Sequence, residues 1–362
     1  MTTDYTFHVS EEISDPRWDQ FVADTPGGHH VQTSLWGQVK ATLGWSAKRI
    51  LATQGDTLVG GVQVLCRQIP MVGGIGYVAA GPLLGHEEQG LVDSMFRELL
   101  HFSRNQRLQY VVVQPPTDSE AISGQLSSLG FQASTIELLP TASLLTDLNT
   151  SLDDLLAQMR RQTRRHILRG QEMGIVVREA SRQDVPTFCA LNAATCRRQN
   201  ATQFSEEYFT RMWDVFEPLG HLQIFIAEYD GEPVSALMVV SYRQTVIAKV
   251  LGWSGQHSER KPNETTFWAA IQWAKAHGYR WFDMEGVNRA GATEVLNGRP
   301  LPEPLLKSPD FFKYGFGGQP VLLPESREYI QNSVLRWGYQ KFLSGEGNRR
   351  LAYRISEIIR KR

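Results

Sequence analysis

The two halves of the sequence repeat one order of secondary structure, and this repeat restricts the fold more than any other feature. In each half the apolar pattern predicts a helix, a hairpin of two strands, a further strand, a second helix and a last strand. The predicted hairpins lie at 48–53 with 57–66 and at 222–229 with 233–242. Hairpins give antiparallel strand pairs and helical crossovers give parallel ones, so both sheets should be mixed. The sequence therefore predicts an α/β protein with two domains of similar fold.

The length of the chain agrees with this division, because 362 residues suffice for two domains of ordinary size. We expect the first domain to span residues 1–147 and the second to span residues 148–321. A C-terminal tail, residues 322–362, is expected to be helical from Glu325 and to complete the first domain. In the second domain the apolar spacing predicts one long helix over residues 152–173.

The composition is that of a soluble globular protein, with 41% hydrophobic and 21% charged residues. The 37 basic and 38 acidic residues exclude a globally basic nucleic-acid binder but allow a local basic patch. The three cysteines lack metal-ligand spacing, so we expect neither a metal site nor a disulfide. The first residues do not resemble a secretory signal, and no apolar run is long enough to span a membrane. We expect a cytoplasmic protein, which leaves open a peripheral contact with the inner membrane surface.

The most unusual segment is rich in arginine and lies in the predicted long helix. Its apolar residues form a stripe that should face the core, and its arginines crowd another side of the helix. The arginines are Arg160, Arg161, Arg164, Arg165 and Arg169. Like charges four residues apart cost a few tenths of a kcal/mol each, and a polyanion such as RNA phosphate, or a diphosphate, would offset that cost. The alternative, which the sequence favours equally, is that these arginines form an ordinary solvent-exposed helix face with no polyanion bound.

Two shorter segments also carry candidate chemistry. Lys313 lies among aromatic and glycine residues in 311–318, a setting that suits an anionic group or a developing oxyanion, although an ordinary loop lysine fits the pattern as well. Further upstream, Ser34 is expected to cap a helix that carries Trp36 inward and Lys40 outward. No nucleophile elbow, zinc-protease, P-loop or dinucleotide-binding motif is present in the sequence.

Taken together, these segments resemble the FemABX family, whose members use aminoacyl-tRNA to add amino acids to peptidoglycan precursors. The similar motifs keep the family's order over most of the chain. They are Gln32-Thr33-Ser34-x-Trp36-x-x-x-Lys40 with Gly44-Trp45, then Gly81-Pro82, the arginine-rich helix ending at Gly174, Gly252 with Pro262-Asn263, Phe282-Asp283-Met284-Glu285-Gly286-Val287, and Phe312-Lys313-x-Gly315-Phe316-Gly317-Gly318. The resemblance implies two tandem GNAT-like (acyl-CoA N-acyltransferase-like) domains, in a FemX-like member without the coiled-coil arm that some members carry.

The resemblance also implies an activity and a set of site residues. The expected enzyme moves an amino acid from aminoacyl-tRNA to the stem peptide of a peptidoglycan precursor, either lipid II or UDP-MurNAc-pentapeptide, and so forms cell-wall cross-bridges. Lys313 would stabilise the tetrahedral oxyanion, Asp283 is a candidate catalytic carboxylate, and Lys40 would contact the sugar-nucleotide part of the precursor. The other expected substrate contacts are Trp36, Tyr208, Trp253 and Phe312. The five arginines are expected to bind tRNA, and no cofactor or metal is expected.

Two other classes of function stay open at this point. A GNAT-type N-acetyltransferase that uses acetyl-CoA, of the kind linked to exopolysaccharide and envelope synthesis, would need a glycine-containing turn for the pyrophosphate before a helix. Residues 258–264, before the predicted helix at Thr265, lack those glycines, which disfavours acetyl-CoA. The third class is a non-catalytic module that binds RNA or a membrane surface. For Asp283 and Glu285, a purely structural role at a strand end is the competing interpretation.

Overall fold

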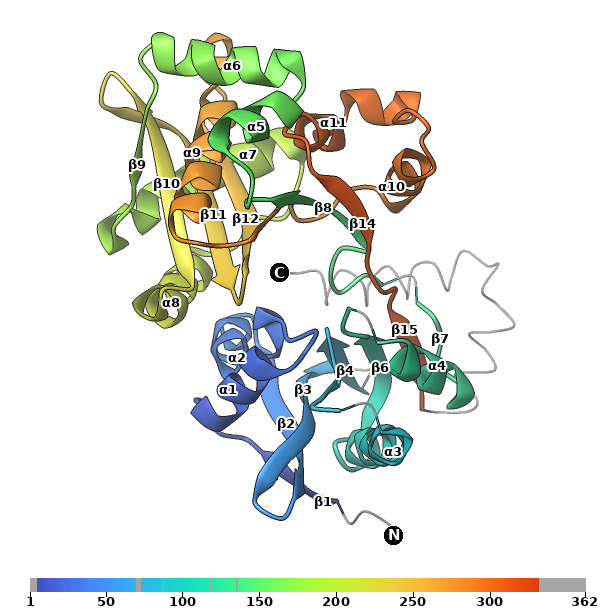
Figure 1. The fold of residues 1–362 in the computed structure, drawn as a ribbon. Helices are drawn as coiled ribbons and strands as arrows, with labels where there is room; N and C mark the ends of the chain where they lie inside the picture. The colour runs from blue at the N-terminus through green and yellow to red at the C-terminus, as the bar shows by residue number, and fades with distance from the viewer. Residues whose placement is uncertain (1–4, 70–72, 87, 118, 135, 332–362) are drawn as a thin grey trace. The chain divides into compact units, whose positions relative to one another are not determined.

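The computed structural model describes residues 5–331 apart from 70–72, 87, 118 and 135, and it divides the chain into two units. The first unit runs up to Leu139 and resumes at Pro324, and the second spans Pro140–Leu323. Each unit contains its own mixed β-sheet with helices packed on it (Figure 1). The α/β class with two mixed sheets is therefore confirmed. None of the helices among the described residues is long and apolar enough to cross a membrane.

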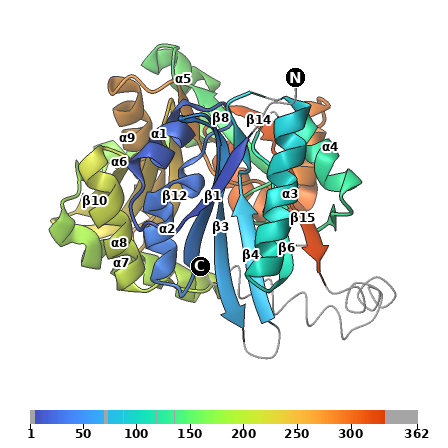
Figure 2. The same cartoon turned by 90° about the horizontal axis from the view of Figure 1, so that it is seen from below.

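The sheet of the first unit has the strand order β1-β2-β3-β4-β6-β15-β7, with β5 paired to β3. Its strands are β1 (Thr6–Ser10), β2 (Ser46–Gln54), β3 (Thr57–Ile69), β4 (Gly73–Ala79), β5 (Leu83–Leu84), β6 (Leu108–Gln114), β7 (Gln132–Ala133) and β15 (Arg327–Ile330). Its helices are α1 (Pro16–Asp24), η1 (His30–Gln32), α2 (Ser34–Ala41), α3 (Gln89–Asn105) and α4 (Glu120–Ser128). The apolar face of α3 packs on the central strands, where Figure 2 shows it lying along the sheet.

The sheet of the second unit has the order β14-β8-β13-β12-β11-β10-β9. Its strands are β8 (Ala142–Asp147), β9 (Val176–Glu179), β10 (Leu222–Tyr229), β11 (Glu232–Tyr242), β12 (Thr245–Trp253), β13 (Trp281–Asp283) and β14 (Gln319–Leu322). Its α-helices are α5 (Leu152–Gln158), α6 (Arg161–Glu172), α7 (Val185–Gln199), α8 (Glu206–Phe216), α9 (Pro262–Ala276), α10 (Arg289–Leu296) and α11 (Pro309–Tyr314). Short 3-10 helices lie at η2 (Arg182–Asp184), η3 (Glu217–Leu219), η4 (Ser258–Arg260) and η5 (Glu303–Lys307).

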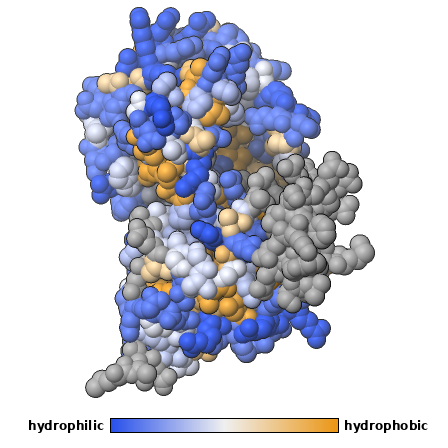
Figure 3. All heavy atoms as spheres, turned by 90° about the vertical axis from the view of Figure 1, so that its right-hand side faces the viewer, coloured by the Kyte–Doolittle hydropathy of each residue, from blue (hydrophilic) through white to orange (hydrophobic). Residues whose placement is uncertain are grey.

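The two sheets have the same topology, which confirms the repeat seen in the sequence. In each sheet an antiparallel run of four strands is followed by one parallel pair, β4 with β6 or β12 with β13, and then by antiparallel strands. Each unit also buries an apolar cluster of its own. Hydrophilic side chains cover most of the surface shown in Figure 3, and apolar side chains gather in smaller patches.

The structure differs from the sequence-based expectation at three places. The division between units falls at Leu139, before the expected boundary at residue 147, because β8 pairs with β13 and β14 of the second sheet. The long helix expected over 152–173 is broken into α5 and α6, since the residues between them are extended and the Arg160 N–H bonds to the Gly315 carbonyl at 2.9 Å. The tail begins with a strand, β15, that pairs with β6, whereas a helix was expected from Glu325. The prediction for the tail beyond residue 331 lies outside the described residues.

Candidate active site

Lys313 lies in α11 of the second unit, in a short helix that several contacts hold in place. Ser308 caps the helix by accepting a hydrogen bond from the backbone N–H of Asp310 at 3.2 Å. Phe312 packs on Phe267 of α9, with ring centroids 5.4 Å apart, and on Phe316 at 5.2 Å. The aromatic residues of this motif therefore anchor α11 to the core and hold the backbone of Lys313 in place.

The Lys313 ammonium group faces the backbone of the turn that follows β13. Its Nζ donates to the carbonyl oxygens of Glu285, at 2.5 Å, and of Gly286, at 2.6 Å. An ammonium group has three N–H bonds, so one is left without a partner among the described residues. Burial lowers the pKa of Lys313, and the carboxylates of Glu285, Asp310 and Asp283 act in the opposite direction. The group is thus a largely buried cation with one donor to spare.

The turn itself has an unusual backbone. Glu285 has φ 43° and Gly286 has φ 80°, both in the left-handed region. Glycine adopts this conformation without strain, whereas a side chain such as that of Glu285 costs roughly 1–2 kcal/mol there. Both carbonyl oxygens accept hydrogen bonds from the one Lys313 ammonium group. A strained non-glycine residue at such a place is typical of functional sites.

Asp283, at the end of β13, lies beside this turn. Its Oδ1 accepts hydrogen bonds from the Ser143 hydroxyl of β8 and from the Glu285 backbone N–H at 2.8 Å. Burial raises the pKa of Asp283 to about 6, against the opposing effects of those hydrogen bonds and of the Lys313 charge. A carboxyl group with this pKa is mostly ionised at neutral pH and still able to take up a proton, as a general base must.

A fourth charge, which sequence reasoning missed, completes the group. Lys249 of β12 forms an ion pair with the Glu285 carboxylate, and the two side chains are only 9% and 15% exposed. We call Lys249, Asp283, Glu285 and Lys313 the charged cluster. A single lysine in a strand is usually a solvent-facing residue, so nothing in the local sequence marks Lys249 as part of a site.

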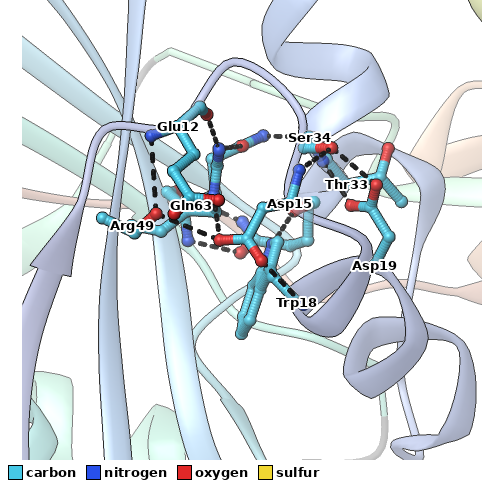
Figure 4. A network of polar contacts seen from close by, with 10 residues as sticks. Glu12, Asp15, Trp18, Asp19, Thr33, Ser34, Arg49 and Gln63 are labelled. Atoms are coloured by element: carbon cyan, nitrogen blue, oxygen red, sulfur yellow. Dashed lines mark hydrogen bonds and ion pairs between the residues drawn. The ribbon is translucent and has the colours of Figure 1, made fainter.

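In the first unit, a network of buried polar side chains fixes the start of α2 (Figure 4). Asp19 accepts hydrogen bonds from the backbone N–H and the hydroxyl of Ser34, both at 2.5 Å. Asp15 pairs with Arg49 at 3.4 Å, and Arg49 also donates to the Gln63 side chain at 3.3 Å. Burial raises the pKa of Asp19. The network anchors the helix that carries two of the expected substrate contacts.

Those contacts, Trp36 and Lys40, are arranged differently from the expectation. Trp36 points inward as predicted, but Lys40 is only 4% exposed, so the prediction that it faces outward is wrong. Its Nζ lies 5.5 Å from the ring centroid of Trp36 and 5.8 Å from that of Tyr77, and aromatic faces stabilise a buried cation. The cap of α2 is Thr33, and Ser34, the expected cap, is the first helical residue.

The five arginines divide into two groups. Arg160 and Arg164 make contacts within the protein. The Arg160 guanidinium donates to the Phe311 carbonyl, and its Cζ lies 3.6 Å from the centroid of the Phe311 ring. Arg164 donates to the Ala157 carbonyl at 2.8 Å. The other three line an open concavity of about 790 Å³ along α6. Its described lining is Arg161, Gln162, Arg165, His166, Leu168, Arg169, Glu172 and Met173.

The first turn of α9 is covered by α6. A Cβ atom on Gly170 of α6 would lie 2.0 Å from the Thr265 hydroxyl oxygen, so the two helices are in close contact there. His166 of α6 pairs with Glu264 at 2.8 Å, and Arg260 donates to the Met173 carbonyl at 2.7 Å. A helix N-terminus is a natural site for a phosphate group. Here side chains of that turn pack on another helix, and the Glu264 carboxylate lies within the turn.

The remaining expected contacts lie in separate parts of the second unit. Tyr208 of α8 is 4% exposed and stacks on Phe204, with ring centroids 4.2 Å apart. Trp253 ends β12, where the Arg198 guanidinium lies 4.7 Å from its ring. The roles of these side chains in substrate binding stay predictions.

Comparison with known proteins identifies both units. Residues 13–138, in the first unit, match the sequence model of the FemAB family, and residues 157–293, in the second, match that of an acetyltransferase (GNAT) domain. The solved structure of FemX aligns with 92% of this chain and 99% of its own, with a TM-score of 0.78 and 16% identity. The first unit is therefore similar in sequence to the FemAB family, and the whole chain shares its fold with FemX. The tandem GNAT architecture of the chain also aligns with a tandem GNAT protein from the clavulanic acid biosynthesis pathway, with a TM-score of 0.55 over 90% of this chain and 98% of the other, at 11% identity.

Curated relatives of the chain include two staphylococcal enzymes named lipid II:glycine glycyltransferase. The Staphylococcus saprophyticus protein is 21% identical over 234 residues, which cover 61% of this chain and 56% of the relative. The Staphylococcus aureus protein is 20% identical over 230 residues, covering 60% and 54%. The chain thus spans about half the length of the curated relatives it matches.

Proposed function

We propose that this chain is an aminoacyltransferase that moves an amino acid from aminoacyl-tRNA to the stem peptide of a peptidoglycan precursor. The observation that carries the proposal is the charged cluster, in which a buried ammonium with a spare N–H lies near a carboxyl group whose pKa is about 6. Similarity to the FemAB family and relatives named for transfer of glycine to lipid II support it.

The reaction is the aminolysis of an ester. The acceptor amine attacks the aminoacyl carbonyl, an amide C–N bond forms, and the ester C–O bond to the tRNA breaks. In this proposal the spare N–H of Lys313 donates to the oxyanion of the tetrahedral intermediate. Asp283, ionised at neutral pH, accepts the proton that the amine loses and passes it to the 3′-oxygen of the tRNA, which leaves as a hydroxyl. The reaction needs no metal or cofactor besides aminoacyl-tRNA.

Substrate binding would fall to other side chains. Lys40 is proposed to bind the anionic part of the precursor, lipid II or UDP-MurNAc-pentapeptide. Arg161, Arg165 and Arg169 on the exposed face of α6 are proposed to contact tRNA phosphates. A lipid-linked acceptor would bring this cytoplasmic protein to the inner membrane surface. The exposed apolar side chains of Leu296, Leu306 and Phe311 are available for that contact.

The second candidate is an N-acetyltransferase that uses acetyl-CoA, and the match of residues 157–293 to a GNAT domain favours it. The Glu264 carboxylate in the first turn of α9 argues against it, because that turn would have to receive the negatively charged CoA pyrophosphate. We therefore rank it below aminoacyl transfer.

The test is to incubate the full chain with a mixture of aminoacyl-tRNAs and with either lipid II or UDP-MurNAc-pentapeptide, and to analyse the precursor by mass spectrometry. The expected product is heavier by one amino-acid residue, and its fragmentation identifies both the amino acid and the stem residue that received it. A parallel reaction contains acetyl-CoA in place of tRNA. An acetylated product there, with no product from aminoacyl-tRNA, would replace the first candidate by the second.

A further inference from the structure

Lys249 lies at an irregularity in the pairing of β12 with β11. Across the β11–β12 pair, Met238 lies opposite Val250 and the next residue, Val239, lies opposite Ala248. Lys249 is therefore the extra residue of a β-bulge, a feature that turns a side chain out of the regular alternation and is common next to active sites. The pairing of β12 with β13 extends only as far as Ile247. The bulge thus lies just past the last paired residues, toward the turn that holds Glu285.

Glu285 connects the three other members of the charged cluster through three different groups. Its backbone N–H donates to Asp283, its carbonyl oxygen accepts from Lys313, and its carboxylate pairs with Lys249. Lys313 consequently touches Glu285 only through the uncharged carbonyl oxygen among the described contacts. The carboxylate of Glu285 is paired with Lys249 and acts on Lys313 only through space.

The carboxylate of Glu285 belongs to a residue whose carbonyl already lies 2.5 Å from Lys313 Nζ. If its present partner were removed, rotation of a flexible side chain would suffice to bring it to the ammonium group. An ion pair there would use the spare N–H and neutralise the charge that an anionic substrate group needs. We propose that Lys249 is a positioning residue that holds the Glu285 carboxylate away from Lys313, and so keeps the Lys313 ammonium available to a substrate oxyanion.

This inference rests on the proposed function only for its kinetic consequence, so its test has two readouts. The first is the pH dependence with which an activated ester acylates the Lys313 amine, followed on the corresponding peptide by mass spectrometry without any substrate. The second is the steady-state rate of aminoacyl transfer. The variants are Lys249→Met, Lys249→Arg and the double variant Lys249→Met with Glu285→Gln. The control is Arg178→Met, which removes the ion pairs of Arg178 with Asp184 and Glu228 in the same unit, away from the cluster.

In Lys249→Met the freed carboxylate should raise the apparent pKa of Lys313 by about one unit or more, so that acylation at a fixed pH slows roughly tenfold. The kcat of transfer should fall by a similar factor with little change in either KM. The double variant has no carboxylate to misplace, so both readouts should return toward wild type. Lys249→Arg keeps the pair and should behave like the wild type, and Arg178→Met should leave acylation unchanged.

An unchanged titration of Lys313 in Lys249→Met overturns the proposal, whatever the transfer assay shows. A double variant as impaired as the single one also overturns it, because a purely structural role for Lys249 predicts that outcome. If Lys249→Met does not fold, Lys249→Arg and the double variant decide: the proposal fails if Lys313 titrates abnormally in either. A wild-type chain that transfers no amino acid contradicts the proposed function but leaves the acylation experiment decisive for Lys249.

Discussion

Each unit contains one lysine of a motif that resembles the FemABX family, and the contacts of the two lysines differ. Lys40 in the first unit lies over the faces of Trp36 and Tyr77. Lys313 in the second unit is bonded to two carbonyl groups and has carboxylates nearby. Aromatic faces stabilise a cation without adding a formal negative charge of their own. This difference suggests separate tasks for the two lysines.

A cation that lies against aromatic faces suits a permanent anion such as a phosphate, which is bound equally in the ground state and the transition state. A cation that donates to two neutral carbonyl oxygens and keeps one N–H to spare suits a charge that appears only during the reaction. The strained turn at Glu285, the raised pKa of Asp283 and the lowered pKa of Lys313 all lie around the second lysine. We therefore assign binding of the precursor to Lys40 and stabilisation of the oxyanion to Lys313.

Replacing Lys313 by Met should have the largest effect. The variant keeps the length of the side chain but loses the proposed oxyanion donor, so kcat should fall by at least about 10²-fold with the fold intact. Steady-state kinetics and circular dichroism measure the two quantities. Lys307→Met, at an exposed position in η5, is the matched control. Near wild-type turnover in Lys313→Met would remove this lysine from the mechanism.

Asp283→Asn should slow transfer, although less than Lys313→Met does, and at the same time stabilise the protein in a pH-dependent way. The pKa of Asp283 is raised from 3.8 to about 6, so the ionised carboxylate destabilises the folded state above pH 6 and has no such effect below about pH 4. The gain from Asn should therefore appear between pH 4 and pH 6 and reach up to ~3 kcal/mol. Thermal unfolding at several pH values measures it, and a gain that is independent of pH would contradict the assignment.

Lys40→Ala should affect binding of the precursor and not the chemical step. Loss of a charged contact to a phosphate is worth ~1.5–3 kcal/mol, so the KM for the precursor should rise about 10- to 100-fold while kcat changes little. Lys48→Ala, at a surface ion pair of β2, is the control. If kcat fell and KM stayed constant, Lys40 would belong to the chemistry.

The smallest effect is expected on α6. Changing Arg161 and Arg165 to Gln should weaken aminoacyl-tRNA binding and lower the log–log salt slope by about one unit for each lost phosphate contact. The control changes Arg197 and Arg211, two exposed arginines of α7 and α8, in the same way. Equal affinities and slopes in both variants would make the α6 face a solvated surface. Loss of precursor binding with intact tRNA binding would make it a diphosphate site.

The repeated topology could be predicted from the sequence because its hairpins and helices follow simple periodicity. The turn Asp230-Gly231 is an example of such a local signal, because both residues adopt the left-handed conformation that two-residue hairpin turns need. Periodicity also placed Arg161, Arg165 and Arg169 on one side of a helix, which the concavity confirms.

Other features depend on contacts far apart in the chain and leave no local signal. The break before α6 arises because Arg160 bonds to the Gly315 carbonyl, so apolar spacing alone predicts one continuous helix. Lys249 joins the charged cluster only because a bulge turns it there. Lys40 of α2 lies against Tyr77, which belongs to β4 and is distant in the sequence.

The most direct test of this division of labour is a single-turnover experiment with enzyme in excess over aminoacyl-tRNA and the precursor varied up to saturation. We predict that Lys40→Ala reaches nearly the wild-type rate constant at saturating precursor, whereas Lys313→Met stays slow at every precursor concentration. Recovery of the Lys313→Met variant at high precursor, or a Lys40→Ala variant that remains slow at saturation, would contradict it.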